Sequence, residues 1–141
     1  MQSDWSNWGN EVIEEAGEAL DFYVIHQYAF FEPPGSFEAA LAQPQATWQL
    51  MMAEVQAGFD NYGNGRRPPI AVTEHNLFSV QDQDNGQWMT RAVNLLFMAD
   101  TIGQMATNGF TLANQWDLAN GLAGNGTDYG LLNADTLARY P

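Results

Sequence analysis

Three short apolar runs, separated by much longer stretches, constrain the fold of this chain more than any other feature. Two of them, FYVI at residues 22–25 and IAV at residues 70–72, are rich in β-branched or aromatic residues and indicate buried strands. The third, FTLANQWDL at residues 110–118, reads as a strand that runs into a loop. The intervening stretches are long enough for crossover helices, which parallel strands require. The sequence therefore predicts an α/β fold with parallel strands.

Apolar residues at helical spacing predict a helix before each of these strands. The helices are expected over residues 8–20, 37–63 and 88–108, with Pro44 dividing the second into a short and a longer piece. The tail, residues 128–141, is predicted to be a strand or hairpin arm. Residues expected to face the sheet are Trp48, Met51, Met52, Val55 and Phe59 in the second helix, and Trp88, Val93, Leu96 and Met105 in the third.

The order helix, strand, helix, strand, helix, strand corresponds to about three-eighths of a (β/α)₈ barrel. A chain of 141 residues without an internal repeat is expected to bury one core. We therefore expect residues 1–141 to form a single domain with the fold of a partial barrel.

The charge of the chain restricts its partners. There are 17 Asp and Glu against four Arg and no Lys, which gives a formal net charge of −13. Nucleic-acid phosphates and anionic membranes are repelled by such a field, whereas an uncharged polysaccharide is not. We expect no nucleic-acid partner and no membrane partner.

Several residue types bear on metals and on the cellular compartment. The chain has no Cys, and therefore no disulfide and no thiolate zinc site, and His26 and His75 lack metal-ligand spacing. The acidic loop at Asp82 and Asp84 lacks the later Glu of a calcium loop and is expected to be solvated. No metal is expected. The first ten residues do not resemble a secretion signal and no stretch is long enough to span a membrane. The expectation is a soluble protein, either cytoplasmic or secreted with its signal absent from this chain.

Each predicted strand is followed by polar residues. In a parallel sheet the carboxyl ends of the strands meet at one edge, where barrel enzymes carry out their chemistry. The residues expected at this edge are His26, Gln27 and Tyr28 after the first strand, Glu74, His75 and Asn76 after the second, and Asn114, Gln115, Trp116 and Asp117 after the third.

Three motifs carry a resemblance to a known family. WGNEVIEEAGEALDFYVIHQY, PPIAVTEHN and TLANQWDL, in this order, resemble strands six, seven and eight of retaining glycoside hydrolases of clan A. The resemblance is greatest to the α-L-arabinofuranosidases of family 51 and extends from Trp5 to about Leu118. It implies that the chain is the C-terminal part of a (β/α)₈ barrel that hydrolyses arabinose- or xylose-containing plant polysaccharide without a cofactor.

The resemblance also implies roles for individual residues. Glu74 matches the nucleophile and Tyr28 matches the tyrosine whose hydroxyl donates to it. His26, Asn76, Gln115 and Trp116 are implied to shape the sugar pocket. The family has Trp where this chain has His75, between Glu74 and Asn76.

The second carboxyl group that a retaining enzyme needs, about 5 Å from the first, is not matched. In the family it follows an Asn at the end of strand four, and this chain resembles only later strands. Glu11, in the sequence GNE, is an alternative, but the apolar spacing after it indicates a helix. The expectation is that the acid/base comes from elsewhere. A sheet of three parallel strands also leaves its edges unpaired, so we expect a homo-oligomer.

Less specific interpretations remain open. Glu74 could be a surface carboxylate, His26 a core residue and Tyr28 a packing aromatic, while Trp116 could either stack on a sugar or plug the barrel mouth. Other clan A enzymes, such as β-xylosidases, endoglucanases and endoxylanases, place a Glu at the same strand end. A non-catalytic carbohydrate-binding half-barrel is the alternative from a different functional class.

Overall fold

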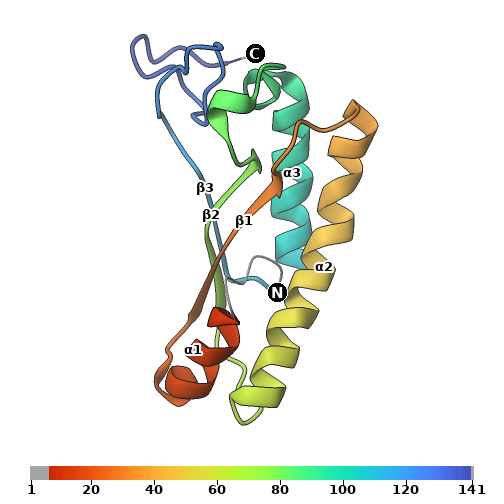
Figure 1. The fold of residues 1–141 in the computed structure, drawn as a ribbon, viewed down its shortest axis with the longest axis vertical. Coiled ribbons are helices and arrows are strands. Elements are labelled where there is room, and N and C mark those ends of the chain that lie inside the picture. Colours follow the sequence, from red (N-terminus) through yellow and green to blue (C-terminus); the bar gives the residue numbers. More distant parts are fainter. Residues whose placement is uncertain (1–6, 141) are drawn as a thin grey trace.

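A three-stranded parallel sheet with helices packed on one of its faces forms the framework of the protein (Figure 1). The computed structural model describes residues 7–140. The strands are β1 (Tyr23–Phe30), β2 (Ile70–Phe78) and β3 (Leu112–Gln115), in the order β1-β2-β3, and they alternate with the helices α1 (Trp8–Ala16), α2 (Phe37–Tyr62) and α3 (Ala92–Thr107). The predicted α/β class with parallel strands is confirmed, and the arrangement is that of successive units of a (β/α)₈ barrel.

β1 and β2 are longer than predicted, β3 is shorter, and helices cover only one face of the sheet. β1 and β2 stay paired as far as Phe30 and Phe78, so the polar residues expected after the strands lie inside them. Residues 22–25 were predicted to form a buried strand, but only alternate residues of it are buried, since Ile25 is 7% exposed and Val24 is 41% exposed. Such alternation arises because α2 and α3 lie side by side on one face and leave the other bare (Figure 1).

The second helix is continuous, so the predicted division at Pro44 is wrong. It begins with a hydrogen bond from the Ala39 N–H to Ser36 Oγ (3.1 Å). Pro44 removes one backbone donor, but the buried stripe of α2 continues on both sides of it, through Ala40 and Trp48. Packing of this stripe outweighs the lost hydrogen bond.

The third helix begins at Ala92, not at Trp88 as predicted. Residues 88–90 form a separate 3₁₀ turn, because Asp84 accepts hydrogen bonds from the N–H groups of Trp88 (2.8 Å) and Met89 (3.1 Å). Thr127 Oγ1 donates to the same carboxylate at 2.6 Å. Asp84 is fully buried, so the expectation that it lies in a solvated loop is wrong.

Two clusters of buried side chains form the core between the sheet and the helices. The expected sheet-facing residues of α2 are all buried, and so are Val93 and Met105 of α3, whereas Leu96 is 57% exposed and Trp88 is partly buried. The larger cluster contains Ile13, Tyr23, Ile25, Trp48, Met51, Met52, Val55, Phe59, Ile70, Val72, Met105 and Phe110, and the smaller contains Ala40, Leu77, Val93, Phe97 and Met98.

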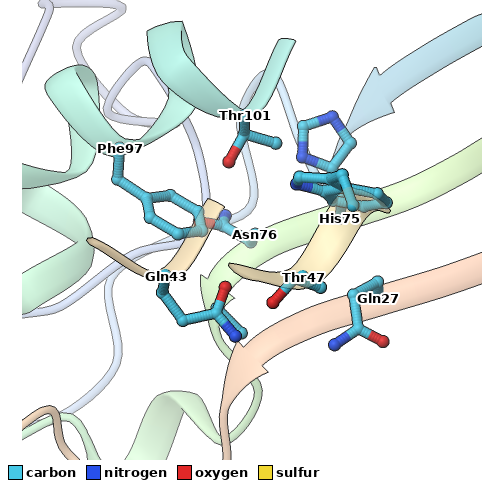
Figure 2. A pocket seen from close by; sticks show the side chains of 9 residues that line it. Gln27, Gln43, Thr47, His75, Asn76, Phe97 and Thr101 are labelled. Atoms are coloured by element: carbon cyan, nitrogen blue, oxygen red, sulfur yellow. The ribbon is translucent and has the colours of Figure 1, made fainter. Parts of the chain in front are cut away.

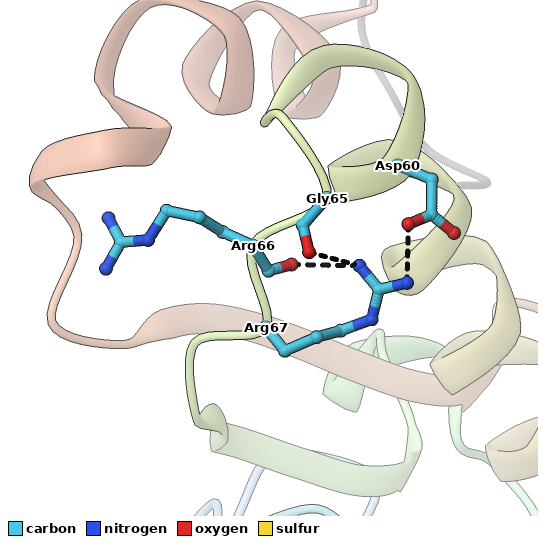
Figure 3. A network of polar contacts seen from close by, with 4 residues as sticks. All are labelled: Asp60, Gly65, Arg66 and Arg67. Atoms are coloured by element: carbon cyan, nitrogen blue, oxygen red, sulfur yellow. Dashed lines mark hydrogen bonds and ion pairs between the residues drawn. The ribbon is translucent and has the colours of Figure 1, made fainter.

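Two arginines stabilise the turn between α2 and β2. Arg67 forms an ion pair with Asp60 (2.5 Å) and donates to the carbonyl oxygens of Gly65 and Arg66 (Figure 3). Arg66 donates to the carbonyl oxygen of Gly17 (2.6 Å), at the end of α1. The Arg67 pair is half-exposed and contributes little stability. These contacts fix α1 against the end of α2, where the strands begin.

The tail is not a strand or hairpin arm, because residues 116–140 contain only one isolated antiparallel bridge, between Leu132 and Arg139. The tail folds as a long loop at the end of the sheet where β1 and β2 finish (Figure 1). Buried Asp128 fixes the loop by accepting hydrogen bonds from the Gly130 N–H (2.8 Å) and the Tyr140 hydroxyl (2.8 Å).

Candidate functional site

The candidate site is built around Glu74 in the second half of β2. Side chains alternate along a strand, and since His75 faces the helices, Glu74 faces the bare side of the sheet. Its side chain is 25% exposed. The Tyr28 hydroxyl, from β1, donates a hydrogen bond to Glu74 Oε1 and so holds the carboxylate in one orientation.

An irregularity in the β1–β2 pairing brings these residues together. Ile25 pairs with Val72, but His26 pairs with Glu74, so Thr73 is an extra residue on β2. A bulge of this kind turns side chains away from the regular alternation. As a result, His26 Nδ1 lies 3.4 Å from Glu74 Oε2, and His26 Nε2 is hydrogen-bonded to Thr73 Oγ1 at 2.9 Å.

The Tyr28 hydroxyl stays protonated over the whole physiological range. Burial, followed by the hydrogen bond from Tyr28 to Glu74 and the negative charge of that carboxylate, raises the pKa of Tyr28 well above its usual range. The phenol therefore acts as a permanent donor to Glu74. The other oxygen of the carboxylate, Oε2, is not engaged by Tyr28.

Asn76 lies close in sequence to Glu74 but is fully buried. Its Nδ2 donates to the carbonyl oxygens of Trp116 (2.5 Å) and Tyr129 (3.1 Å), and its Oδ1 accepts from the Leu77 N–H (2.7 Å). In this conformation Asn76 joins β2 to the segment after β3 and to the tail.

Gln115 and Trp116 lie at the end of β3, beside β2. Gln115 pairs with His75 in the sheet register, and its Nε2 is buried without a hydrogen-bond partner among the described residues. The backbone N–H of Trp116 donates to the His75 carbonyl oxygen (3.0 Å), which fixes this residue beside β2. Trp116 remains accessible, at 42% exposure. Within residues 7–140, no hydrogen bond joins either side chain to Glu74.

Tyr129 is a further residue of the site that the sequence did not single out. Asp117, which was expected at this edge of the sheet, also lies near Tyr28, since its charge contributes to the raised pKa of that phenol. The Tyr129 ring packs edge-on against Tyr28 with centroids 6.0 Å apart, and its hydroxyl donates to the Ser79 carbonyl (2.6 Å). Burial, and after it the charge of Asp128, raises the pKa of Asp117. No local pattern could have indicated Tyr129, because its contact joins a tail without regular structure to Tyr28, about a hundred residues earlier in the chain.

His75 lies on the opposite side of β2 from Glu74, in a closely packed pocket between the sheet, α2 and α3 that both polar and apolar side chains line (Figure 2). Its ring packs edge-on against Trp48 at a centroid distance of 6.3 Å, and neither ring nitrogen has a hydrogen-bond partner in the described part of the chain. Burial lowers the pKa of His75 to about 4, so the ring is neutral at pH 7. The edge-on contact of His75 with Trp48 of α2 accounts for an aromatic ring at position 75.

Glu11, the alternative acid/base, lies in the first turn of α1. This helix packs near the end of the sheet where the strands begin, far from the end where they finish (Figure 1). Glu11 therefore does not belong to the site around Glu74. Among residues 7–140 no group of three His, Cys, Asp or Glu side chains could hold a metal ion, and no helix there is long and apolar enough to cross a membrane.

Comparisons with known proteins support the fold. No family model matches the chain, and no curated protein matches it in sequence. Solved structures that resemble it include an α-L-arabinofuranosidase from Thermotoga maritima in its arabinose complex, with 21% sequence identity and a TM-score of 0.61. The match covers 92% of this chain and 27% of that one, so the chain spans about a quarter of the length of the arabinofuranosidase. The fold of this chain is thus related to part of a (β/α)₈-barrel glycoside hydrolase.

Proposed function

We propose that this chain forms part of a retaining glycoside hydrolase of the α-L-arabinofuranosidase type, related to family 51 of clan A, with Glu74 as the nucleophile. One observation carries the proposal: a carboxylate on the bare face of a parallel sheet is oriented by a tyrosine hydroxyl and flanked by a histidine from the neighbouring strand. The similarity in fold to an arabinofuranosidase supports the sugar class.

In the proposed mechanism each oxygen of Glu74 has a separate task. Oε1 accepts from Tyr28, and Oε2 attacks the anomeric carbon of the sugar. The bond from this carbon to the leaving oxygen breaks, and an ester bond to Glu74 forms. A water molecule then hydrolyses this ester and restores the carboxylate. Protonation of the leaving oxygen and activation of the water require a second carboxyl group.

The substrate is proposed to be an arabinose- or xylose-containing plant polysaccharide. Trp116 presents an exposed ring on which a sugar can stack, and His26 lies beside the attacking oxygen. The amide nitrogen of Gln115 has no hydrogen-bond partner among residues 7–140, but it is buried in this structure. Asn76, also proposed to belong to the sugar pocket, acts in this structure by fixing the backbone of Trp116. No cofactor takes part in this chemistry.

Substrates with a good leaving group test Glu74 as the nucleophile even when the acid/base carboxyl group is absent. Dinitrophenyl arabinofuranosides, xylosides and glucosides need little acid assistance, so Glu74 can be tested alone. Release of dinitrophenol should occur with the native chain and with Glu15→Ala, an exposed carboxylate on α1, and should vanish in Glu74→Ala. Release that persists in Glu74→Ala excludes the proposed nucleophile. The preferred sugar distinguishes an arabinofuranosidase from a β-xylosidase, an endoglucanase or an endoxylanase.

A non-catalytic carbohydrate-binding role is the second candidate. The position of Glu11 favours it, because this alternative for the acid/base lies at the other end of the sheet. This role predicts that arabinose or xylose oligosaccharides shift the NMR signals of Trp116 and His26 while no dinitrophenyl substrate reacts. Turnover that depends on Glu74 would exclude it.

A further inference from the structure

Tyr129 is held in place by three hydrogen bonds to β2 and to the turn after it. Its backbone carbonyl oxygen accepts from Asn76 Nδ2 (3.1 Å). Its hydroxyl donates to the Ser79 carbonyl oxygen (2.6 Å) and accepts from the Gln81 N–H (3.0 Å). Both the backbone and the far end of the side chain are therefore fixed, whereas residues of irregular loops are usually more mobile.

The tail beside Tyr129 is fixed as well. Gln81 Nε2, from the turn after β2, donates to the Thr127 carbonyl oxygen (3.2 Å). Asp128, which directly precedes Tyr129 and is fully buried, accepts from the Tyr140 hydroxyl (2.8 Å). These contacts tie the backbone around Tyr129 to the end of the sheet where β1 and β2 finish (Figure 1).

The fixed ring of Tyr129 packs against Tyr28. The two ring centroids are 6.0 Å apart and the ring planes meet at 66°, an edge-to-face arrangement that stabilises aromatic pairs. Tyr28 is the donor to Glu74 Oε1. Burial raises the pKa of Tyr129, and the negative charge of Glu74 adds to this, so Tyr129 also lies near that carboxylate. Tyr129 is therefore a neighbour of both the donor and the acceptor in the hydrogen bond that orients Glu74.

The hydrogen bond from Tyr28 to Glu74 forms only while the Tyr28 side chain stays in one rotamer. The hydroxyl lies at the far end of the side chain, so a rotation about the Cα–Cβ bond carries it away from Glu74. Tyr28 is only partly buried, so a neighbour on one side of its ring restricts this rotation.

We propose that Tyr129 is a positioning residue whose ring, anchored by the tail, holds Tyr28 in the rotamer that donates to Glu74. Tyr129 acts through Tyr28 and does not itself touch the reacting atoms. The effect on the reaction rests on the proposed function of Glu74, whereas the effect on the Tyr28 side chain does not.

Carbon-13 NMR tests the positioning of Tyr28 without any turnover. The five tyrosines are labelled at Cζ, the ring carbon that carries the hydroxyl, and the Tyr28 signal is identified by its absence from Tyr28→Phe. Glu74→Gln replaces a charged acceptor by a neutral amide and should shift the Tyr28 signal. In Tyr129→Leu the Tyr28 ring can turn away, so the same Glu74→Gln change should shift that signal at most about half as much.

The kinetic consequence is a loss of rate without a loss of binding. Single-turnover release of dinitrophenol from a dinitrophenyl arabinofuranoside gives the maximal rate and the half-saturating concentration separately. Tyr129→Leu should lower the maximal rate roughly threefold to tenfold, the equivalent of one aromatic contact, and change the half-saturating concentration less than about twofold. In Tyr28→Phe, the further change Tyr129→Leu should have no effect on the rate, since no hydroxyl is left to position.

Two further variants separate this role from a general loosening of the tail. Tyr140→Phe removes the donor to Asp128 but keeps the contact between Tyr129 and Tyr28, so its rate should stay near that of the native chain. Tyr129→Phe keeps the ring and loses only the hydroxyl contacts, so its rate should lie between those of the native chain and Tyr129→Leu. Tyr129→Phe replaces Tyr129→Leu in every comparison if the latter loses the native circular dichroism spectrum.

Three results would overturn the proposal. The first is a Tyr28 signal that responds equally to Glu74→Gln in the native chain and in Tyr129→Leu. The second is a rate effect of Tyr129→Leu that persists in Tyr28→Phe, or a raised half-saturating concentration, which would indicate a direct sugar contact. The third is an equal loss of rate in Tyr140→Phe. Absence of dinitrophenol release from every protein, with the expected NMR response, would count against Glu74 as nucleophile and not against the positioning of Tyr28.

Discussion

Buried His75 makes the stability of this protein depend on pH in a way that can be calculated. The groups that line its cavity come from β1, α2, β2 and α3 and include no carboxylate and no cation. They are Gln27 and Ala29 of β1, then Gln43, Thr47 and Trp48 of α2, then Asn76 of β2, and finally Phe97 and Thr101 of α3 (Figure 2). Nothing in the cavity therefore compensates a positive charge on the imidazole ring.

The magnitude follows from the shift in the pKa of His75. In the unfolded chain the ring titrates near its usual value of 6.5, and in the folded chain burial lowers the pKa to about 4. Between these values the unfolded state binds the extra proton, so the free energy of unfolding falls as the pH falls. Each pKa unit corresponds to about 1.4 kcal/mol, and the total loss is about 3 kcal/mol. Above pH 6.5 this contribution is fully present.

Urea unfolding at pH 7.5 and at pH 4.5 measures this effect. We compare the native chain with His75→Phe, which keeps an aromatic ring against Trp48, and with the control His26→Phe, which removes an exposed histidine. Since carboxylates also titrate in this range, the difference between variants is the informative quantity. Since pH 4.5 lies above the folded-state pKa, the native chain and His26→Phe should lose about 2.5 kcal/mol more than His75→Phe does. An equal loss in all three proteins would refute the assignment of the effect to His75.

Three further predictions concern residues that form specific hydrogen bonds. Tyr28→Phe removes the donor to Glu74 and should slow dinitrophenol release roughly tenfold to a hundredfold with little change in the urea midpoint; an unchanged rate would contradict the orienting role. Ser36→Ala removes the cap of α2 and should lower the free energy of unfolding by about 1 kcal/mol in urea titrations, while no change would show that the cap is not formed. Asp84→Ala should release the Thr127 hydroxyl and make the tail exchange its amides much faster, and a tail that stays protected would contradict this anchor.

The parts of the fold that depend on local sequence were predictable. Residues 22–25 and 70–72 marked two strands, and the apolar spacing of α2 identified its buried face from Trp48 to Phe59. The break expected at Pro44 was wrong, because a local preference gave way to packing over the whole length of the helix. The exposure of Leu96 was also unforeseen, since periodicity does not tell which face of an apolar helix is covered.

The candidate site was predictable in its residues but not in its geometry. The resemblance to the glycoside hydrolases implied that the Tyr28 hydroxyl donates to Glu74, and this hydrogen bond is present, although both residues lie inside β1 and β2 and not after them as the strand pattern predicted. The extra residue Thr73, which brings His26 opposite Glu74, leaves no mark in a single sequence because neither Gly nor Pro signals the bulge. The contact of Tyr129 with Tyr28 depends on how a long irregular tail folds back, which no periodicity describes.

Mass spectrometry of the protein and of its proteolytic peptides tests the nucleophilic role of Glu74 most directly. The chain is incubated with a dinitrophenyl arabinofuranoside, quenched in acid during the first turnover and digested with a protease. The proposed mechanism predicts a mass increase of one pentose residue, located on the β2 peptide at Glu74 and absent from Glu74→Ala. Dinitrophenol release without any sugar bound to the protein, or a sugar bound to a different carboxylate, would contradict the mechanism.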